Sequence, residues 1–242
     1  MANIKKADRK PNKNKVQRVD IAKLDRIVDT VISPRDLEAR LSSGKRLRIK
    51  FGVDCTARFL HLGHAVNLWY MREFQNAGHV VDLLLGTATT RIGDPTGQNQ
   101  ARPTLSDEEI NANAEAFLEQ LGLVLLTDPE HMRVWRNGDW FDGMSTVEFL
   151  RLASRMTVGQ LSNRKTIKDR QKNGQEVRLS EFLYPLLQGY DSVHLKSDLA
   201  PVGSDQLFNE AVIGRDLQVK FGQRPQVVIT TRITMGLCGK AK

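Results

Sequence analysis

Two histidines separated by two residues stand where a predicted strand gives way to a predicted helix. The motif His61-Leu62-Gly63-His64 lies between a strand pattern at 47–54 and a helix pattern at 65–77. Histidines three positions apart share one face of a helix, and Gly63 lets a ligand approach the backbone closely. Because the first N–H groups of a helix are free and its dipole is positive there, this position favours phosphate. The motif therefore predicts a phosphate-binding site.

The same histidines have two other interpretations. They could form a zinc pair, or they could be core histidines whose nitrogens are satisfied by hydrogen bonds. Zinc needs further ligands, and only Cys55 and His79 lie nearby in the sequence. The two cysteines, Cys55 and Cys238, are far apart and form neither a metal-type nor a redox-type pair. We therefore expect no protein-bound metal and a reducing, cytoplasmic setting.

Two further loops carry polar residues after predicted strands. Ile92-Gly93-Asp94-Pro95-Thr96-Gly97 follows the strand pattern at 80–85, and Gly203-Ser204-Asp205-Gln206 follows a shorter one at 199–202. By itself the first sequence is typical of a surface turn, and the second is typical of a helix N-cap.

Three polar residues share one face of a predicted helix at 180–195. Tyr184, Gln188 and Asp191 are spaced at i, i+4 and i+7. A solvated polar stripe is the usual explanation, but the flanking residues are apolar, so these polar groups would be enclosed. Pro185 should kink this helix or mark its first turn.

The elements that must position these residues follow from the hydrophobic periodicity. Helices are predicted at 21–32, 34–41, 65–77, 106–122, 145–156, 158–172, 180–195 and 206–221, and strands at 47–54, 80–85, 199–202 and 226–230. The strand, helix and strand from 47 to 85 form a βαβ unit, which needs a parallel sheet. The order predicts an α/β, Rossmann-like parallel sheet with a mostly helical connective insertion at about 98–197.

The charge of the chain is concentrated at its start. The net charge of the 242 residues is +8, and residues 1–18 carry most of it. A basic leader over residues 1–20 could contact a polyanion such as RNA, or it could be a flexible solubilising segment. No stretch approaches the ~18 apolar residues that a membrane helix needs, and no secretory signal is evident.

Taken together, the motifs resemble a known family. His61-Leu62-Gly63-His64 is similar to the first signature of class I aminoacyl-tRNA synthetases. Gly52-Val53-Asp54-x-Thr56, Ile92-Gly93-Asp94-Pro95, the segment Phe182–Ser192 and Gly203-Ser204-Asp205-Gln206-x-Phe208-Asn209 resemble bacterial tyrosyl-tRNA synthetases, in the same order and with similar gaps. The resemblance runs from about Val31 to the end of the chain.

The resemblance implies a two-step reaction and a role for each matching residue. Tyrosine would react with ATP, accompanied by Mg²⁺, to give tyrosyl-adenylate, and the tyrosyl group would pass to tRNA(Tyr). The family places Thr56, His61 and His64 at the phosphates as the catalytic residues, and Gly52, Asp54, Gly63, Gly203 and Asp205 at ATP. It places Lys50, Asp94, Tyr184, Gln188, Asp191 and Gln206 at tyrosine. Asp191 would accept a hydrogen bond from the phenol hydroxyl, and Asp94, Tyr184 and Gln188 would hold the ammonium.

The sequence also departs from the family pattern. Cys55 stands where proline is usual, and Lys50 stands where many bacterial members have a tyrosine and a subgroup has lysine. The chain stops at Gly239-Lys240-Ala241-Lys242, where Lys242 could begin the second signature, Lys-Met-Ser-Lys-Ser. We therefore expect residues 21–242 to be a catalytic domain without the anticodon-binding region and with impaired activity. The resemblance also implies a homodimer joined through the helical insertion.

Three alternatives remain at this point. Ala200-Pro201-Val202 is closer to the tryptophanyl relatives, whereas Gln188-Gly189-Tyr190-Asp191 and Phe208-Asn209 favour tyrosine. A non-catalytic RNA-binding paralogue would use the basic leader and a degenerate pocket. Another nucleotidyltransferase with the histidine motif would leave the segments at 182–192 and 203–209 unexplained.

Overall fold

A six-stranded sheet forms the centre of the molecule. The computed structural model describes residues 16–17, 19, 26–93 and 105–234. The strands are β1 (Val28–Ile32), β2 (Arg48–Val53), β3 (Val80–Leu85), β4 (Met132–Arg136), β5 (Leu199–Gly203) and β6 (Val227–Thr231). Their order is β1-β6-β5-β2-β3-β4, and all neighbours are parallel except the pair of β1 and β6. The prediction of a Rossmann-like parallel sheet is confirmed.

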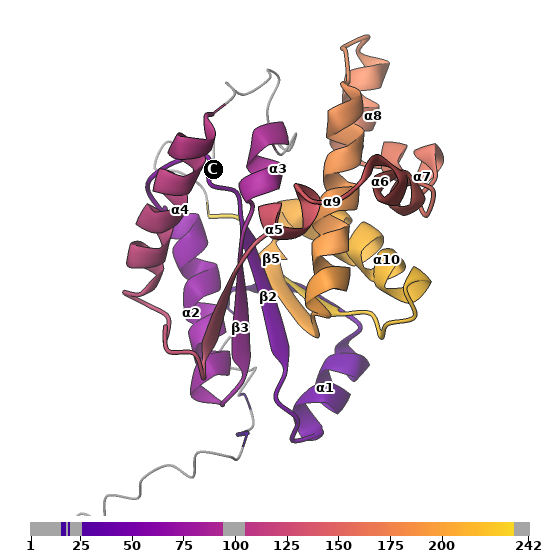
Figure 1. The fold of residues 1–242 in the computed structure, drawn as a ribbon. Coiled ribbons are helices and arrows are strands. Elements are labelled where there is room, and N and C mark those ends of the chain that lie inside the picture. The colour runs from indigo at the N-terminus through magenta and orange to yellow at the C-terminus, as the bar shows by residue number, and fades with distance from the viewer. Residues whose placement is uncertain (1–15, 18, 20–25, 94–104, 235–242) are drawn as a thin grey trace, which may run out of the picture.

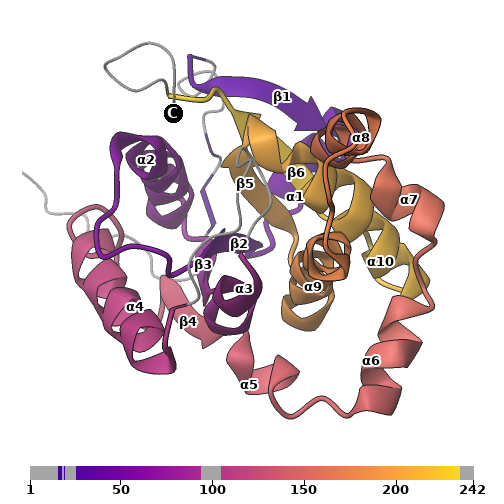
Figure 2. The same ribbon diagram turned by 90° about the horizontal axis from the view of Figure 1, so that it is seen from above.

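Helices cover both faces of this sheet (Figures 1 and 2). The helices are α1 (Pro34–Ser42), α2 (Leu62–Asn76), α3 (Thr87–Ile92), α4 (Asp107–Leu121), α5 (Gly138–Phe141), α6 (Thr146–Ala153), α7 (Val158–Ser162), α8 (Lys165–Lys172), α9 (Leu179–Leu195), the 3-10 helix η2 (Ser204–Gln206), the π-helix η3 (Phe208–Gly214) and α10 (Arg215–Lys220). Seen from above in Figure 2, α2 and α4 lie on one face of the sheet, and α3 and α9 lie on the other.

The two larger apolar clusters of the described residues hold these layers together. The larger one packs α2 and α4 against the sheet through residues such as Phe51, Phe74, Leu83 and Phe117. The second joins α6, α7 and α9 to η3 and α10. This second cluster fixes α9, and Ser192 on this helix accepts a hydrogen bond from Lys50 of β2. No helix among the described residues is long and apolar enough to cross a membrane.

The prediction of a helix at 21–32 is wrong for its second half. Val28–Ile32 is strand β1, and it pairs antiparallel with β6 at the edge of the sheet. Four of its five residues are β-branched, which favours a strand, and so short an apolar pattern fits either period. Residues 20–25 lie outside the described part of the chain, as does most of the basic leader. Gln17 donates its backbone N–H to the carbonyl of Ala77 at 2.8 Å, and Val19 is buried in the larger cluster.

The predicted boundary of the helical insertion also needs correction. Strand β4, which sequence analysis missed, lies inside the range 98–197 and pairs with β3. Helix α4 packs into the larger cluster with the sheet. Both therefore belong to the sheet domain, and the mostly helical segment begins only at α5.

Three helix predictions change in detail. The helix expected at 158–172 is divided into α7 and α8, because the chain is extended at Arg164. The helix expected at 206–221 is a succession of η2, η3 and α10. Pro185 lies inside α9 rather than in its first turn.

Candidate functional site

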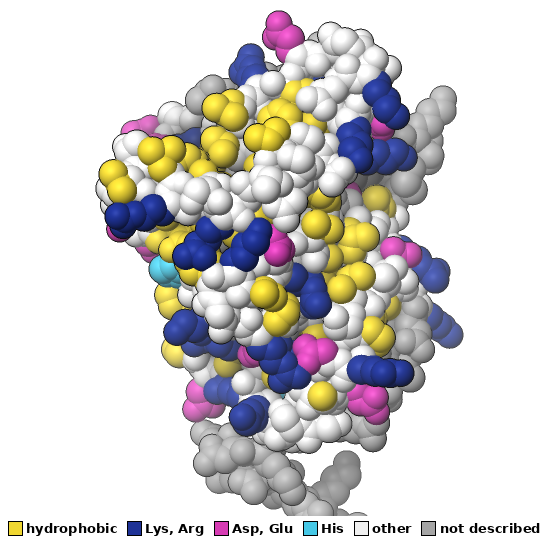
Figure 3. Space-filling model, turned by 90° about the vertical axis from the view of Figure 1, so that its right-hand side faces the viewer, with side chains coloured by type: hydrophobic (Ala, Val, Ile, Leu, Met, Phe, Trp, Pro, Cys, Tyr) yellow, Lys and Arg dark blue, Asp and Glu magenta, His cyan; other side chains and the backbone are white. Residues whose placement is uncertain are grey.

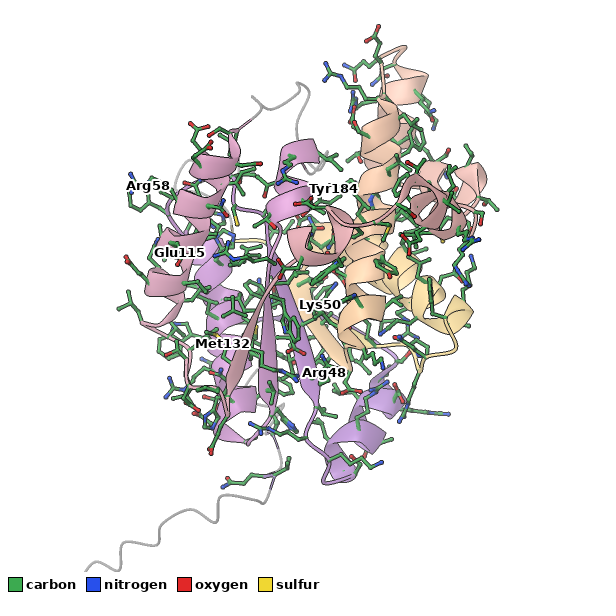
Figure 4. The ribbon with its side chains drawn as sticks, viewed as in Figure 1. Arg48, Lys50, Arg58, Glu115, Met132 and Tyr184 are labelled. Atoms are coloured by element: carbon green, nitrogen blue, oxygen red, sulfur yellow. The ribbon has the colours of Figure 1, made fainter. Side chains whose placement is uncertain are left out.

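Most of the predicted site residues that the structure describes lie around the carboxyl ends of the central strands. Strand β2 pairs with β3 on one side and with β5 on the other, so the direction in which strands are added reverses between β2 and β5. Open α/β sheets bind ligands at such a reversal. Gly52 is exposed although it belongs to a central strand, since it has no side chain to cover the sheet. Figure 4 shows Lys50 on the same strand and Tyr184 on the neighbouring helix α9.

The two histidines of the motif lie against each other at the start of α2. His61 is the N-cap, and its ring centroid is 3.9 Å from that of His64. The His64 Nδ1 accepts the backbone N–H of His61 at 3.3 Å, so the proton of the neutral imidazole is on Nε2. Burial, and secondarily His61, lowers the pKa of His64 to about 4. A side chain at Gly63 would lie 3.0 Å from the His61 ring, so glycine makes room for that ring.

Asp54 ends β2 and holds two elements together. Its carboxylate accepts hydrogen bonds from Thr89 Oγ1 at 2.8 Å and from the Tyr184 hydroxyl at 2.9 Å. Gly86 makes this arrangement possible, because a Cβ there would be only 2.3 Å from an Asp54 oxygen. The carboxylate is therefore fixed at the carboxyl end of β2, between Thr89 of α3 and Tyr184 of α9.

Asp191 is buried on the inner face of α9. Its two oxygens accept hydrogen bonds from Trp140 Nε1 at 3.1 Å and from Asn137 Nδ2 at 3.4 Å. Trp140 also stacks on His194, with ring centroids 4.1 Å apart. Burial raises the pKa of Asp191 to about 8, although Lys50 and the two hydrogen bonds oppose this rise. The enclosed stripe of Tyr184, Gln188 and Asp191 was expected from the apolar flanks, and both Tyr184 and Asp191 are buried.

A buried ion pair lies beside Asp191. Lys50 Nζ donates to Glu210 Oε1 and to Ser192 Oγ, each at 2.7 Å, and it approaches the backbone carbonyl of Gln188 at 3.5 Å. Lys50 is 1 % exposed and Glu210 is 2 % exposed. Taking two charges out of water is costly unless their remaining hydrogen bonds are made. Here they are made, because Glu210 also accepts from Gln188 and Gln226.

A chain of amides extends from this pair toward β5. Asn209 Nδ2 donates to Gln188 Oε1 at 2.7 Å and to Gln206 Oε1 at 3.1 Å. At the last residue of β5, a side chain on Gly203 would be 2.5 Å from an Asp205 oxygen, so this glycine lets the carboxylate fold back over the strand. The structure thus brings the motif at 203–209 next to the stripe on α9.

Some residues considered in the sequence lie outside the described ranges or have no described contact with the site. Asp94 and Lys242 lie outside the described residues, as does Cys238. Thr56 is half-buried in the loop before α2. His79, considered above only as a possible further zinc ligand, is buried, and its Nδ1 accepts the backbone N–H of Leu47 at 3.2 Å. Within the described ranges, no three His, Cys, Asp or Glu side chains are grouped so that they could hold a metal ion.

Several residues that build the site could not be predicted from the sequence pattern. Gly86, Thr89, Asn137, Trp140 and Glu210 were not predicted as site residues. Gly86 and Asn137 lie just past strands, Thr89 and Trp140 lie in the short helices α3 and α5, and Glu210 lies in the π-helix η3. In such short or irregular segments, hydrophobic periodicity carries no signal. A charged residue at 210, directly after the Phe208-Asn209 motif and within an apolar helix pattern, was the one available clue.

Comparison with known proteins agrees with this geometry. Residues 42–242 match the family model described as tRNA synthetases class I (W and Y). The chain is 44 % identical over 219 residues to the tyrosine–tRNA ligase of Francisella tularensis and 45 % identical over 219 residues to that of Thermotoga maritima. These alignments cover 90 % of the chain and 54 % of each relative, so the chain spans about half the length of the curated relatives it matches.

Solved structures are similar in fold. A C-terminally truncated mitochondrial tyrosyl-tRNA synthetase of Aspergillus nidulans has a TM-score of 0.73 and 26 % identity, covering 89 % of this chain and 68 % of that structure. The tyrosyl-tRNA synthetase of Archaeoglobus fulgidus in complex with L-tyrosine has a TM-score of 0.74 at 21 % identity, covering 92 % and 67 %. The strand order, the histidine motif at the start of α2 and the family match together show that the chain belongs to the class I tRNA synthetases that include the tryptophan and tyrosine enzymes.

Proposed function

We propose that this chain is the catalytic part of a tyrosine–tRNA ligase. The observation that carries the proposal is the buried carboxyl of Asp191, which Trp140 and Asn137 hold in place on the inner face of α9. A fixed, enclosed acceptor suits a substrate that ends in a hydroxyl. Phenylalanine has no hydroxyl, so it would leave this buried acceptor without a hydrogen-bond partner. Such a loss supports discrimination of tyrosine from phenylalanine of roughly 10⁴- to 10⁵-fold.

The reaction would begin at the other end of tyrosine. A carboxylate oxygen of tyrosine attacks the α-phosphorus of ATP, an oxygen–phosphorus bond forms, and the bond to the β-phosphate oxygen breaks to release pyrophosphate. The protein supplies no nucleophile, so catalysis consists of positioning and of stabilising charge on the phosphates. His64 would donate its Nε2–H as a neutral imidazole, because burial lowers its pKa to about 4. His61, Thr56 and the free N–H groups of α2 would donate beside it.

The remaining residues would bind the nucleoside and the amino acid. Asp54, Gly52, Gly203 and Asp205 lie at the ends of β2 and β5, which suits the ribose. Mg²⁺ would enter with the phosphates of ATP and would supply positive charge there. The donors at α2 fit a phosphate chain already bound to the ion, since the described groups beside it include no carboxylate cluster.

The amino-acid pocket would use the stripe on α9. Gln188 and Tyr184, with Asp94, would hold the ammonium of tyrosine. Lys50 and Gln206 would border the pocket from β2 and η2.

The proposal extends to partners of the whole protein. The tyrosyl group would pass to tRNA(Tyr) in the cytoplasm, and Lys242 would begin the second signature. We further propose a homodimer joined through the helical segment. Exposed apolar residues on α6, α7 and α9 support it, and Figure 3 views this side of the molecule. They are Val147, Leu150, Val158 and Leu179. Sedimentation equilibrium of the chain tests this, and a monomer at all concentrations would reject it.

Calorimetric titration with tyrosine, tryptophan and phenylalanine tests the central proposal. We expect tyrosine to bind and the other two to bind far more weakly. Tighter binding of tryptophan would assign the chain to the tryptophan enzymes. A version extended through the second signature should exchange pyrophosphate into ATP in the presence of tyrosine, faster than the 242-residue chain. No exchange by the extended chain, together with salt-dependent RNA binding, would favour a non-catalytic RNA-binding protein.

A further inference from the structure

Glu210 accepts four hydrogen bonds beside the candidate site, and the proposed reaction gives it no role. Its Oε1 accepts from Lys50 Nζ at 2.7 Å and from Gln188 Nε2 at 2.8 Å. Its Oε2 accepts from Gln226 Nε2 at 2.8 Å and from Ser192 Oγ at 3.3 Å. The π-helix η3 places Asn209 and Glu210 next to each other and both buried. Such irregular turns are frequent at functional sites.

Glu210 determines the orientation of the Gln188 amide and of the Lys50 ammonium, which both belong to the proposed amino-acid pocket. Because the Gln188 amide directs its nitrogen at Glu210, its oxygen is left to face Asn209 and the pocket. An oxygen is what an ammonium group requires. Lys50 has three N–H donors. Glu210, Ser192 and the Gln188 carbonyl lie within reach of them, and no hydrogen bond joins Lys50 to Asp191.

The buried groups in this region include two acids but one cation, so one acid has no cation as a partner. Lys50, Glu210 and Asp191 are each 2 % exposed or less, so one cation lies among two acids. Lys50 is committed to Glu210, and Asp191 has only the neutral donors Trp140 and Asn137. A carboxyl group buried without a cation is favoured in its protonated form.

We propose that Glu210 is the positioning residue that sets amino-acid recognition: by holding the Lys50 ammonium and the Gln188 amide, it leaves Asp191 as an acid that ionises when the phenol hydroxyl of tyrosine donates to it. The inference rests on the proposed function. Removing the charge of Glu210 would free Lys50 for Asp191, which would then be ionised in the empty pocket.

The other groups around Asp191 are consistent with this assignment. Burial raises the pKa of Asp191, Lys50 from β2 opposes the rise, and Glu210 from η3 adds to it. His194 lies one turn further along α9, and part of its side chain is accessible to solvent. Partial desolvation of the ring, and secondarily the charge of Arg48, lowers the pKa of His194. From the segment around α5, Asn137 and Trp140 contribute neutral donors.

The test is the pH dependence of tyrosine binding by the 242-residue chain and its Glu210→Gln variant. Both are titrated with the same ligand, so the ionisation of free tyrosine cancels in the ratio of the two dissociation constants. For the wild type, we expect the affinity to fall roughly tenfold from about pH 8 to about pH 6.5, since the ionised fraction of Asp191 falls. For Glu210→Gln, we expect a flat profile over this range. Equal weakening at every pH, with the wild-type profile retained, would mean that Glu210 is only structural and would overturn the proposal.

A second measurement separates this inference from the proposed function. The infrared difference between the wild type and Asp191→Asn reports a protonated carboxyl at Asp191 without any ligand. In the wild-type background, we expect the C=O band of the protonated Asp191 carboxyl near neutral pH. The band should be lost in the Glu210→Gln background. In the Lys50→Met background, it should persist to higher pH. An unchanged band in both backgrounds would refute the inference even if either variant binds poorly. Band shifts as expected in a chain that binds no tyrosine would reject the proposed function alone.

Discussion

One methyl group at Gly86 should uncouple Asp54 from its two partners. The φ of Gly86 is −75°, so alanine is not excluded by a left-handed backbone. Its Cβ would be 2.3 Å from Asp54 Oδ1, 2.5 Å from Thr89 Oγ1 and 3.3 Å from the Val53 carbonyl oxygen. Contacts below 3.0 Å cannot persist, so the carboxylate must turn away and lose its bond to Thr89, its bond to Tyr184, or both.

The expected cost of Gly86→Ala has two parts. Overpacking lowers the unfolding free energy by about 1–3 kcal/mol, measured by urea unfolding. Misplacing a hydrogen-bonded carboxylate costs about 1.5–3 kcal/mol in ligand affinity, or roughly 10- to 100-fold in the dissociation constant of ATP by calorimetry. Gly143→Ala is the matched control, because Gly143 is exposed and its Cβ would meet nothing within 4 Å. If the two variants had equal urea midpoints and equal ATP affinities, the assigned role of Asp54 would be refuted.

Two further substitutions test other parts of the site. Trp140→Phe keeps an aromatic ring against His194 but removes the indole N–H that reaches Asp191 at 3.1 Å. It should weaken tyrosine binding by about 1.5–3 kcal/mol in calorimetry, and unchanged binding would contradict that role. For His64, the folded pKa of about 4 lies below the ordinary 6.5, so the unfolded chain binds more protons between these values. The unfolding free energy should therefore fall as pH is lowered through this range, by up to about 1.4 kcal/mol per pH unit; denaturation of His64→Gln should show a shallower fall, and parallel curves would contradict the burial of His64.

The parts of the fold that periodicity could predict are those buried on one face over several turns. The stripe of Tyr184, Gln188 and Asp191 was found because a helix of 17 residues repeats its pattern, and apolar flanks enclose it. Strand β1 was misread because five residues with several β-branched side chains satisfy either period. Strand β4 was missed because its sequence, Met-Arg-Val-Trp-Arg, breaks the alternation of apolar and basic residues at the adjacent Val134 and Trp135, and because it lies within a range already assigned to an insertion.

The parts of the site that were missed depend on contacts between distant segments. The role of Glu210 depends on its ion pair with Lys50, which lies 160 positions earlier in the chain. It also depends on the π-helix η3, which residue propensities do not predict. Asp54 needs Gly86 for space, which only the packed backbone reveals. Trp140 gains its role from its hydrogen bond to Asp191, which lies 51 positions later in the chain.

The order of the strands has a consequence for how the protein is made. One hydrogen-bonding edge of β2 pairs with β5, and β1 pairs with β6, so both wait for segments near the end of the described chain. During translation, β1 and β2 leave the ribosome long before Leu199–Gly203 and Val227–Thr231 do. An unpaired apolar strand edge can join another chain instead. We therefore expect the second edge of β2 to be open to pairing with other chains until β5 has been synthesised.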